Sequence, residues 1–310
     1  MEETNELYQE RMKKLDAFRG LRLYEEPVLP YGRRFERSGS LKEIVGHFEE
    51  GKRVKAAGRM TAVRTHGKSA FCDLRDQEGK LQLYFKEDVV GKDPFEFFAK
   101  IDIGDFLGAE GALFKTKTGE PSLRVEHYEF LSKNLRPLPE KWHGLKDVET
   151  RYRQRYVDLI MSEEVRSIFL LRSRLIQKTR NFLDQHGFLE VETPILHPVP
   201  GGAAGEPFKT HHHALDMELY LRLAPELYLK KLLVGGFDRV YEIAKSFRNE
   251  GISTRHNPEF TMLEAYAAYW NYEDMMRFLE EMFVSLAGEL LGKTTLTYET
   301  KEGTATIDLT

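Results

Sequence analysis

The sequence predicts an α+β protein in which a five-stranded barrel precedes an antiparallel sheet flanked by helices. Three observations support this fold class. Short runs of alternating apolar and polar residues follow one another between residues 51 and 133. Ser162–His186 and Asn271–Leu291 carry apolar residues at helical spacing. Between these two helices, two strand-like runs flank a polar loop at residues 248–258.

Composition narrows the function classes. A hydrophobic content of 41% and a charged content of 31% over 310 residues are typical of a water-soluble globular protein. The net charge of −4 gives no global basic field, so any binding of RNA must be local. The single cysteine, Cys72, rules out an internal disulfide and indicates a reducing compartment, so we expect a cytoplasmic protein. No secretory signal and no membrane-spanning run is visible.

The barrel is expected from five short strands with a helix, Asp93–Lys100, between the third and the fourth. The predicted strands are Arg53–Arg64, Ala70–Leu74, Lys80–Phe85, Gly104–Lys115 and Ser122–Leu131. This order is typical of an OB-fold, which commonly binds single-stranded nucleic acid on the face of strands two and three. Arg64, Phe71, Gln82 and Tyr84 lie on or beside that face, where rings stack on bases and polar groups contact base edges. The alternative is that these aromatic residues belong to the core.

The chain is expected to divide into four parts. Residues 1–50 form a charged extension with helices at Leu7–Phe18 and, capped by Ser40, at Leu41–Phe48. Residues 51–133 form the barrel. Residues 134–155 form a linker, which Pro137 and Pro139 prevent from being one continuous helix. Residues 156–310 form the second domain.

The helix at Ser162–His186 begins with a capping serine and ends before Gly187, and a strand at Phe188–Thr193 is expected to follow it. Apolar residues at helical spacing are expected to face inward, namely Val165, Ile168, Phe169, Leu175, Ile176, Phe182 and Leu183. The same pattern suits either a core helix or a subunit interface. In the helix at Asn271–Leu291, the residues expected inward are Met275, Phe278, Leu279, Met282, Phe283 and Leu286.

The central feature is a hairpin made by Val240–Phe247 and Glu259–Tyr266. Strand alternation places Phe260, Met262, Glu264 and Tyr266 on one face, and Arg248 and Glu250 also share a face. Gathering a guanidinium, carboxylates, a ring and a phenol at one surface costs free energy unless a polar ligand fills the space. The alternative is a charged surface hairpin.

Several segments resemble the class II aminoacyl-tRNA synthetases. Phe247-Arg248-Asn249-Glu250, with Arg255 and His256 in the following loop, resembles their motif 2, and NEGISTRHNPEFTMLEAY is closest to the bacterial-type lysyl-tRNA synthetases. The stretches AGRMTAVRTHGKSAF and GKLQLYF resemble the OB domain that binds the tRNA anticodon in this family. The segment Ser162–Pro194 resembles motif 1, which implies a homodimer through it.

The resemblance implies a lysine–tRNA ligase that uses ATP to activate L-lysine and transfers it to tRNA(Lys). Arg248 matches the catalytic arginine that bridges the lysine carboxylate and the α-phosphate. The residues matched to ATP are Arg248, Glu250, Arg255, His256, Asn257 and Phe260. Those matched to lysine are Gly202, Ala203, Glu226, Arg248, Glu264 and Tyr266. Those matched to the anticodon are Arg64, Phe71 and Gln82.

The sequence departs from the family in two places, the substrate loop and the C-terminal part. Gly205-Glu206 stands where the family has Ala-Arg, which reverses a charge in the substrate loop. His211-His212-His213 match a polar, His-containing run of the family and are expected to be structural. They alternate sides in an extended segment, so we expect no metal site within this chain. Motif 3 and the carboxylates that hold Mg²⁺ find no match in residues 267–310. We therefore expect the N-terminal portion of a ligase, incomplete at its C-terminus, with the Mg²⁺ ligands in the missing part.

Other functions are compatible with the same sequence. The chain could be a non-catalytic, anticodon-binding module derived from a class II synthetase, or a dimeric structural partner. Within the enzyme class, an aspartyl- or asparaginyl-type ligase is a lesser alternative. Glu226, which follows Pro225 in an apolar run, could be either a helix N-terminal group or a ligand for a cation.

Overall fold

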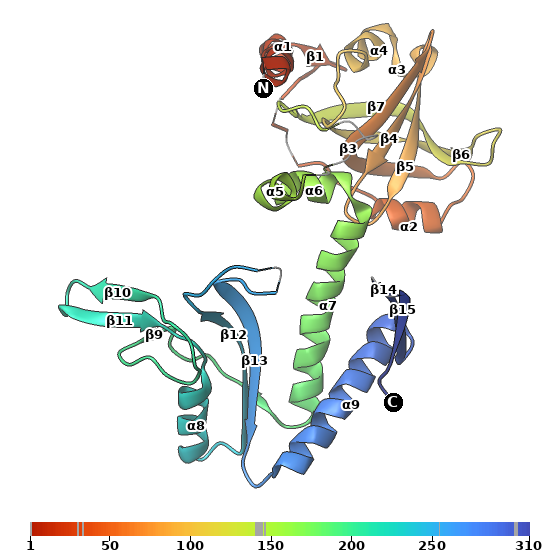
Figure 1. Ribbon diagram of the computed structural model, residues 1–310. Helices are drawn as coiled ribbons and strands as arrows, with labels where there is room; N and C mark the ends of the chain where they lie inside the picture. Colours follow the sequence, from red (N-terminus) through yellow and green to blue (C-terminus); the bar gives the residue numbers. More distant parts are fainter. Residues whose placement is uncertain are drawn as a thin grey trace. The chain divides into compact units, whose positions relative to one another are not determined.

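The computed structural model describes residues 2–29, 31–32, 34–139, 145, 147–253, 255–300 and 303–310. The chain forms two compact units, Met1–Met161 and Ser162–Thr310. Figure 1 shows the barrel of the first unit and the sheet and helices of the second. Each unit has a hydrophobic core of its own. The α+β fold class predicted from the sequence is confirmed.

The first unit contains a closed barrel of five strands in the order β3-β4-β5-β7-β6. The strands are β3 (Arg53–His66), β4 (Ser69–Arg75), β5 (Lys80–Lys86), β6 (Phe106–Lys115) and β7 (Pro121–Ser132). Within this barrel, β5 and β7 pair in parallel and the other neighbouring strands pair in antiparallel fashion. Where one helix was predicted, α3 (Glu87–Val90) and α4 (Lys92–Phe98) flank Gly91, whose φ of +94° interrupts the helical backbone. With this difference, the predicted OB-fold order is confirmed.

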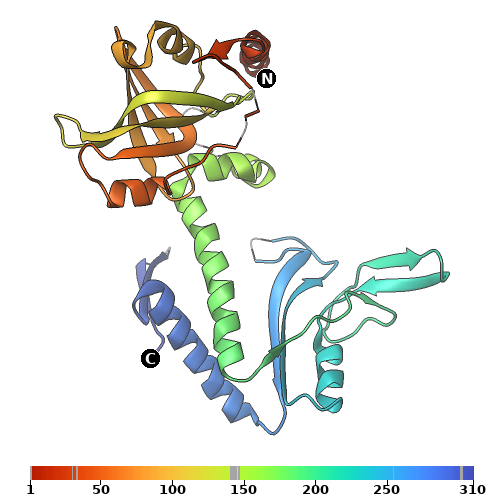
Figure 2. The same ribbon diagram turned by 180° about the vertical axis from the view of Figure 1, so that it is seen from behind.

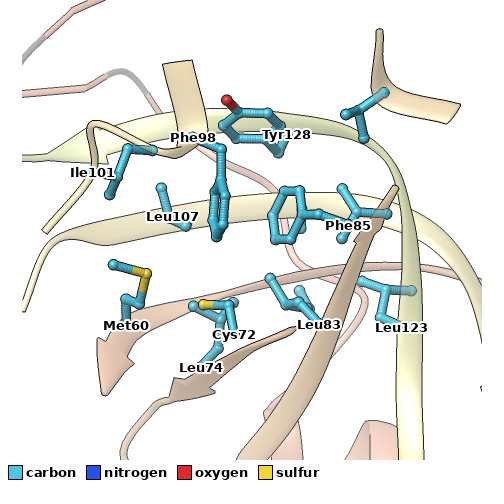
Figure 3. Close-up of a cluster of buried hydrophobic side chains, with 14 of the residues drawn as sticks. Met60, Cys72, Leu74, Leu83, Phe85, Phe98, Ile101, Leu107, Leu123 and Tyr128 are labelled. Carbon is cyan, nitrogen blue, oxygen red and sulfur yellow. The ribbon is translucent and has the colours of Figure 1, made fainter. Parts of the chain in front are cut away.

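The barrel core comes from strand residues at alternate positions (Figure 3). Leu74, Leu83 and Phe85 are among its fully buried side chains, and the Phe85 ring stacks on Phe98 with 4.0 Å between ring centroids. Cys72 is a buried free cysteine in the same cluster, and burial raises the pKa of its thiol. The residues between these buried positions face away from the core, which leaves the outer surface of β4 and β5 available for contacts.

The first unit also contains elements outside the barrel. They are α1 (Glu2–Phe18), β1 (Arg22–Leu23), β2 (Glu26–Pro27), α2 (Leu41–Gly46), α5 (Val148–Arg153) and α6 (Arg155–Met161). Leu15 and Phe18 of α1 are buried, so the end of this predicted surface helix packs on the core. Ser40 caps α2, as predicted. The predicted linker at 134–155 lies in part outside the described residues.

The second unit is built around the hairpin β12 (Arg239–Phe247) and β13 (Glu259–Ala267), which pair in antiparallel register. Its other elements are α7 (Glu163–Gln185), β8 (Leu189–Glu190), β9 (Leu196–His197), β10 (Lys209–His212), β11 (Met217–Leu221), α8 (Glu226–Val234), α9 (Tyr272–Leu291), β14 (Thr295–Thr300) and β15 (Gly303–Asp308). The strand predicted at Phe188–Thr193 is reduced to β8, because it pairs with β12 only at Val240 and Tyr241. Ser162 caps α7 and Asn271 caps α9.

The hairpin has a helix-covered face and a second face that α8 borders (Figures 1 and 2). Phe182 of α7 and Phe278 of α9 pack with Tyr241 of β12 in one apolar cluster. Several helix residues predicted to face inward are instead exposed, namely Ile168, Phe169, Leu175, Leu279 and Phe283. These helices therefore carry more apolar surface than the core of this unit uses.

In the described part of the chain, we find no helix that combines the length and the apolar character needed to cross a membrane.

Candidate functional site

The register of the hairpin gathers the polar side chains on the face opposite the helices. Glu242 lies opposite Glu264, Ala244 opposite Met262, and Ser246 opposite Phe260. Directly opposed residues of an antiparallel pair point to the same side of the sheet. The site face therefore carries Phe260 at one end and the acidic pair at the other, with small or apolar side chains between them.

A buried ion pair forms the floor of this face. Nη1 of Arg222 lies 2.7 Å from Oε1 of Glu242, and both side chains are almost fully buried. Nε of Arg222 donates to the Lys245 carbonyl oxygen at 2.7 Å, and Oγ1 of Thr193 donates to Oε2 of Glu242 at 2.6 Å. These partners hold both charges in place, which a buried pair requires. Sequence reasoning missed this pair, although isolated charges in the runs LYLRLAPELY and VYEIA mark it.

The acidic end of the face is formed by Glu264 and Tyr266. The Tyr266 hydroxyl donates to Oε2 of Glu264 at 3.1 Å. Burial raises the pKa of Glu264, the Tyr266 hydrogen bond opposes this, and the negative charges of Glu226 and Glu242 raise the pKa further. Burial also raises the pKa of Tyr266. Among the described residues, no cation forms an ion pair with Glu264. This carboxylate is therefore suited to a cationic group of a ligand.

Glu226 opens α8 and lies beside the glycine-rich loop at residues 200–207. Gly202 of this loop has φ +86°, and a methyl group built on it would lie 3.3 Å from Cβ of Glu226. Ala203 follows in the same loop. Glu226 stands in the first turn of α8, as expected of a helix N-terminal group, and its Oε1 lies 2.5 Å from Nζ of Lys230. Its role as ligand for a cation of the substrate stays a prediction.

Arg248 marks the opposite end of the face. Its Nε is buried and has no hydrogen-bond partner in the described structure. Its Cζ lies 5.3 Å from the centre of the Phe260 ring, and its backbone N–H donates to the Pro258 carbonyl oxygen at 2.9 Å. A guanidinium with an unsatisfied buried donor favours an anionic ligand, because carboxylates and phosphates accept from such groups with charge assistance.

The loop at residues 200–207 also packs against this basic end. A methyl group on Gly205 would lie 2.8 Å from Oε1 of Glu250 and 3.5 Å from Cδ of Arg248. The Asn249 backbone N–H donates to the Glu206 carbonyl oxygen at 2.8 Å. The glycine of the unusual Gly205-Glu206 pair thus permits the close approach, while Glu206 is held through its backbone.

The turn between the strands carries the other residues predicted to bind ATP, and the structure leaves them at the surface. Nδ1 of His256 lies 2.8 Å from Oγ of Ser253, and Nδ2 of Asn257 donates to the Glu259 carbonyl oxygen at 2.7 Å. Arg255 is exposed beside them. In the described structure, neither Arg255 nor His256 contacts Arg248 directly.

A separate candidate site lies on the barrel, where a groove of about 940 Å³ follows β4 and β5. Arg64, Phe71 and Gln82, the three residues predicted from the sequence, all line it. Phe71 alternates with buried Ala70 and Cys72, so its ring faces outward and packs on Tyr84 with 4.8 Å between centroids. The core alternative for Phe71 is therefore wrong.

Polar and aromatic neighbours complete the groove. Gln82 accepts a hydrogen bond from Oγ of Ser122 at 2.9 Å. Phe114 and Lys117, which sequence reasoning did not select, also line it, and Arg124 lies over the Phe114 ring with Cζ 5.2 Å from its centre. The arrangement offers stacking surfaces with flanking positive charge, which suits unpaired nucleotides.

The histidine run lies on the β10–β11 hairpin. Nε2 of His211 lies 3.2 Å from Oδ1 of Asp216. Within the residues that the structure describes, no group of three or more His, Cys, Asp or Glu side chains is arranged to hold a metal ion.

Known proteins match both units. Residues 54–131 match the family described as OB-fold nucleic acid binding domain, and residues 147–309 match tRNA synthetases class II (D, K and N). Lysine–tRNA ligase of Carboxydothermus hydrogenoformans is 55% identical over 300 residues, or 96% of this chain and 60% of the relative. The corresponding ligase of Moorella thermoacetica is 54% identical over 301 residues, with the same shares. This chain thus spans about 60% of the length of these relatives.

The raised pKa of Glu264 predicts a pH-dependent effect of E264Q on stability. The protonated Glu264 carboxyl favours the folded state over the unfolded chain. Its contribution to the free energy of unfolding is complete below the unfolded-chain pKa, about 4.3, and is lost as pH rises through the higher folded-state pKa. Glutamine does not ionise. The advantage of E264Q over the wild type in unfolding free energy should therefore grow from about pH 4 to pH 7, as measured by urea unfolding. E259Q, an exposed change on the same strand, is the control, and an advantage that shrinks with rising pH would contradict the prediction.

Proposed function

This chain belongs to the class II tRNA synthetase family (D, K and N), and from this premise we propose that it is part of a lysine–tRNA ligase. The complete reaction activates L-lysine with ATP and transfers the lysyl group to tRNA(Lys). The single observation that carries the choice of amino acid is the half-buried Glu264, bound to Tyr266 and without an ion-pair partner in the described structure.

Charge balance on the site face favours lysine over aspartate or asparagine. Glu242 is neutralised by Arg222, whereas within the described part of the chain Glu264 has only the Tyr266 phenol as a direct partner. The ε-ammonium group of lysine would supply the missing positive charge. The carboxylate of aspartate would be repelled there, and the amide of asparagine would leave the charge unpaired, which is costly in a partly buried site.

The opposite end of the face suits the reacting groups. In adenylation the lysine carboxylate attacks the α-phosphorus of ATP, an O–P bond forms, and pyrophosphate leaves. Two anions must approach, so positive charge and correct positioning are the main requirements. We assign this role to Arg248, whose buried Nε has no hydrogen-bond partner among the described residues. We assign adenine stacking to Phe260, with Glu250 and Asn257 as further nucleotide contacts, and the outer phosphates to Arg255 and His256.

The family implies Mg²⁺ together with ATP. The described residues offer no cluster suited to this ion, and we therefore assign it no ligand and derive no step through it. For the same proposed ligase, we assign the α-amino group of lysine to Glu226, with Gly202 and Ala203 beside it. We propose a cytoplasmic location, which the buried free thiol of Cys72 fits.

Lysine-dependent exchange of pyrophosphate into ATP tests the catalytic proposal. We expect exchange with L-lysine and not with aspartate or asparagine. R248Q should lower it by about 100-fold or more, as loss of one transition-state donor does elsewhere, whereas R277Q, an exposed change on α9, should not. Exchange driven by aspartate or asparagine would contradict the assignment. Absence of exchange with retained binding of tRNA(Lys) would mean either that adenylation needs parts of the ligase that this chain does not carry or that the chain is a non-catalytic binding module.

The barrel groove is the proposed contact for the anticodon of tRNA(Lys). Arg64 and Gln82 would contact base edges beside a base stacked on Phe71, because all three side chains line one groove. F71A should weaken binding of a tRNA(Lys) transcript by about 5- to 100-fold, the usual effect of losing a stacking ring. F106A removes a ring of the barrel outside the groove and serves as control in a fluorescence anisotropy titration. An equal effect of both variants would argue against the groove.

We propose that the segment Ser162–Pro194 forms a homodimer interface. Ile168 is 57% exposed and Leu175 is 40% exposed on α7, although both have the helical spacing of core residues. I168D places a charge in the proposed seam and should convert a dimer to a monomer in sedimentation velocity runs. V234D makes the same kind of change at an apolar residue of α8 that is 90% exposed and should leave the dimer intact. A wild-type protein that is monomeric in these runs would contradict the proposed dimer interface.

A further inference from the structure

The amino-acid site contains an ammonium group of its own. Lys230 of α8 lies one helical turn beyond Glu226, and its Nζ is 2.5 Å from Oε1 of that carboxylate. The same Nζ lies 5.9 Å from the centre of the Tyr266 ring. Lys230 thus touches the group assigned to the α-amino end of the ligand and borders the phenol assigned to its ε-ammonium end.

We propose that Lys230 is a positioning residue for the amino-acid site, because its ammonium holds one oxygen of Glu226 and leaves the other for the α-amino group of the ligand. This inference rests on the proposed function, since it concerns the same site. It adds a residue that neither the motifs nor the resemblance selected.

The contacts of Glu226 support shared use of its carboxylate. In the described structure, Lys230 contacts only Oε1, so Oε2 remains available. The glycine-rich loop limits the space on the backbone side, since a methyl group on Gly202 would lie 3.3 Å from Cβ of Glu226. The ion pair with Lys230 thus fixes the remaining side-chain torsions of Glu226. Binding of the ligand to Oε2 of Glu226 then costs less side-chain entropy.

The charges of the site support the same assignment. Glu226, Glu242 and Glu264 are close enough for the charges of Glu226 and Glu242 to act on Glu264. Arg222 neutralises Glu242, and Lys230 neutralises Glu226. Glu264 is then the one carboxylate of this trio without an ion-pair partner among the described residues. Loss of Lys230 would leave two uncompensated carboxylates and disturb the orientation of Glu226.

A purely helical role for Lys230 is the alternative. A Glu–Lys pair at this spacing and in this order stabilises an isolated helix only weakly, and the Lys230 side chain is 53% exposed. Such a pair would affect folding slightly and would not distinguish between ligands. A positioning role and a purely helical role for Lys230 can therefore be distinguished by comparing ligands with and without an α-amino group.

The test uses the full chain and isothermal titration with two ligands, L-lysine and 6-aminohexanoate, which lacks only the α-amino group. K230M should weaken binding of L-lysine by about three- to tenfold, a value reduced for the exposure of the pair, and 6-aminohexanoate by less than about twofold. K230R should restore most of the affinity for L-lysine. K231M removes the neighbouring lysine charge, which lies over Tyr228, and should leave both affinities unchanged.

A double-mutant cycle identifies the route of the effect. If Lys230 acts through Glu226, K230M should add nothing to E226Q in the binding of L-lysine. Equal weakening of both ligands by K230M, additive effects in the cycle, or tighter binding of L-lysine by K230M would each overturn the inference while leaving the proposed function intact. Failure of the wild-type chain to bind L-lysine would overturn the proposed function, and the inference with it.

Discussion

The pairing of β12 with β13 is the constraint on which the second unit depends. The register runs from Arg239 opposite Ala267 to Phe247 opposite Glu259 without a shift. Because side chains alternate along each strand, this register separates an apolar face, which packs on α7 and α9, from a face that carries Glu264 and Phe260. A slip of one residue would bury the charges against the helices and expose the core. The core and the site are thus specified by the same hydrogen bonds.

The buried pair of Arg222 and Glu242 links the surrounding segments to this hairpin. Arg222 follows β11 and binds a carbonyl oxygen of β12, while Thr193, from the segment after β8, binds Glu242. A buried pair of this kind contributes little net stability, because desolvation offsets its attraction. Its effect is positional, since removing either partner would leave an unpaired charge beneath the site. The charges of Arg222 and Glu242 beneath the acidic end of the site are therefore held in fixed positions.

Local patterns predicted much of this structure. Alternation predicted the barrel strands and the hairpin, helical spacing with Ser162 as a cap predicted α7, and helical spacing alone predicted α9. Three features depend on distant partners and escaped prediction. The extent of β8 is set by its pairing with β12, and the ion pair of Arg222 with Glu242 joins two different elements. Ile168 has the spacing of a core residue but lies at the surface, because apolar spacing is the same for cores and interfaces.

The site residues also divide into those that the sequence indicated and those whose role depends on distances in the folded chain. The resemblance to motif 2 directed attention to Arg248, Phe260 and Glu264, and the structure brings Arg248 and Phe260 into contact. The loop residue His256 stays with its own turn, bound to Ser253. Lys230 drew no attention, because a lysine within a helix usually faces solvent. Only the short distance between Lys230 and Glu226 indicates a role in the site.

The order of the central sheet leaves one long strand edge without a neighbour. In the part of the chain that the structure describes, β13 pairs only with β12, so the outward amide and carbonyl groups of Glu259–Ala267 form no ladder on that side. The strand reads EFTMLEAYA and contains neither proline nor lysine, the residues that commonly protect such edges. An open strand edge of this kind is a template on which an extended segment can add a further strand to the sheet.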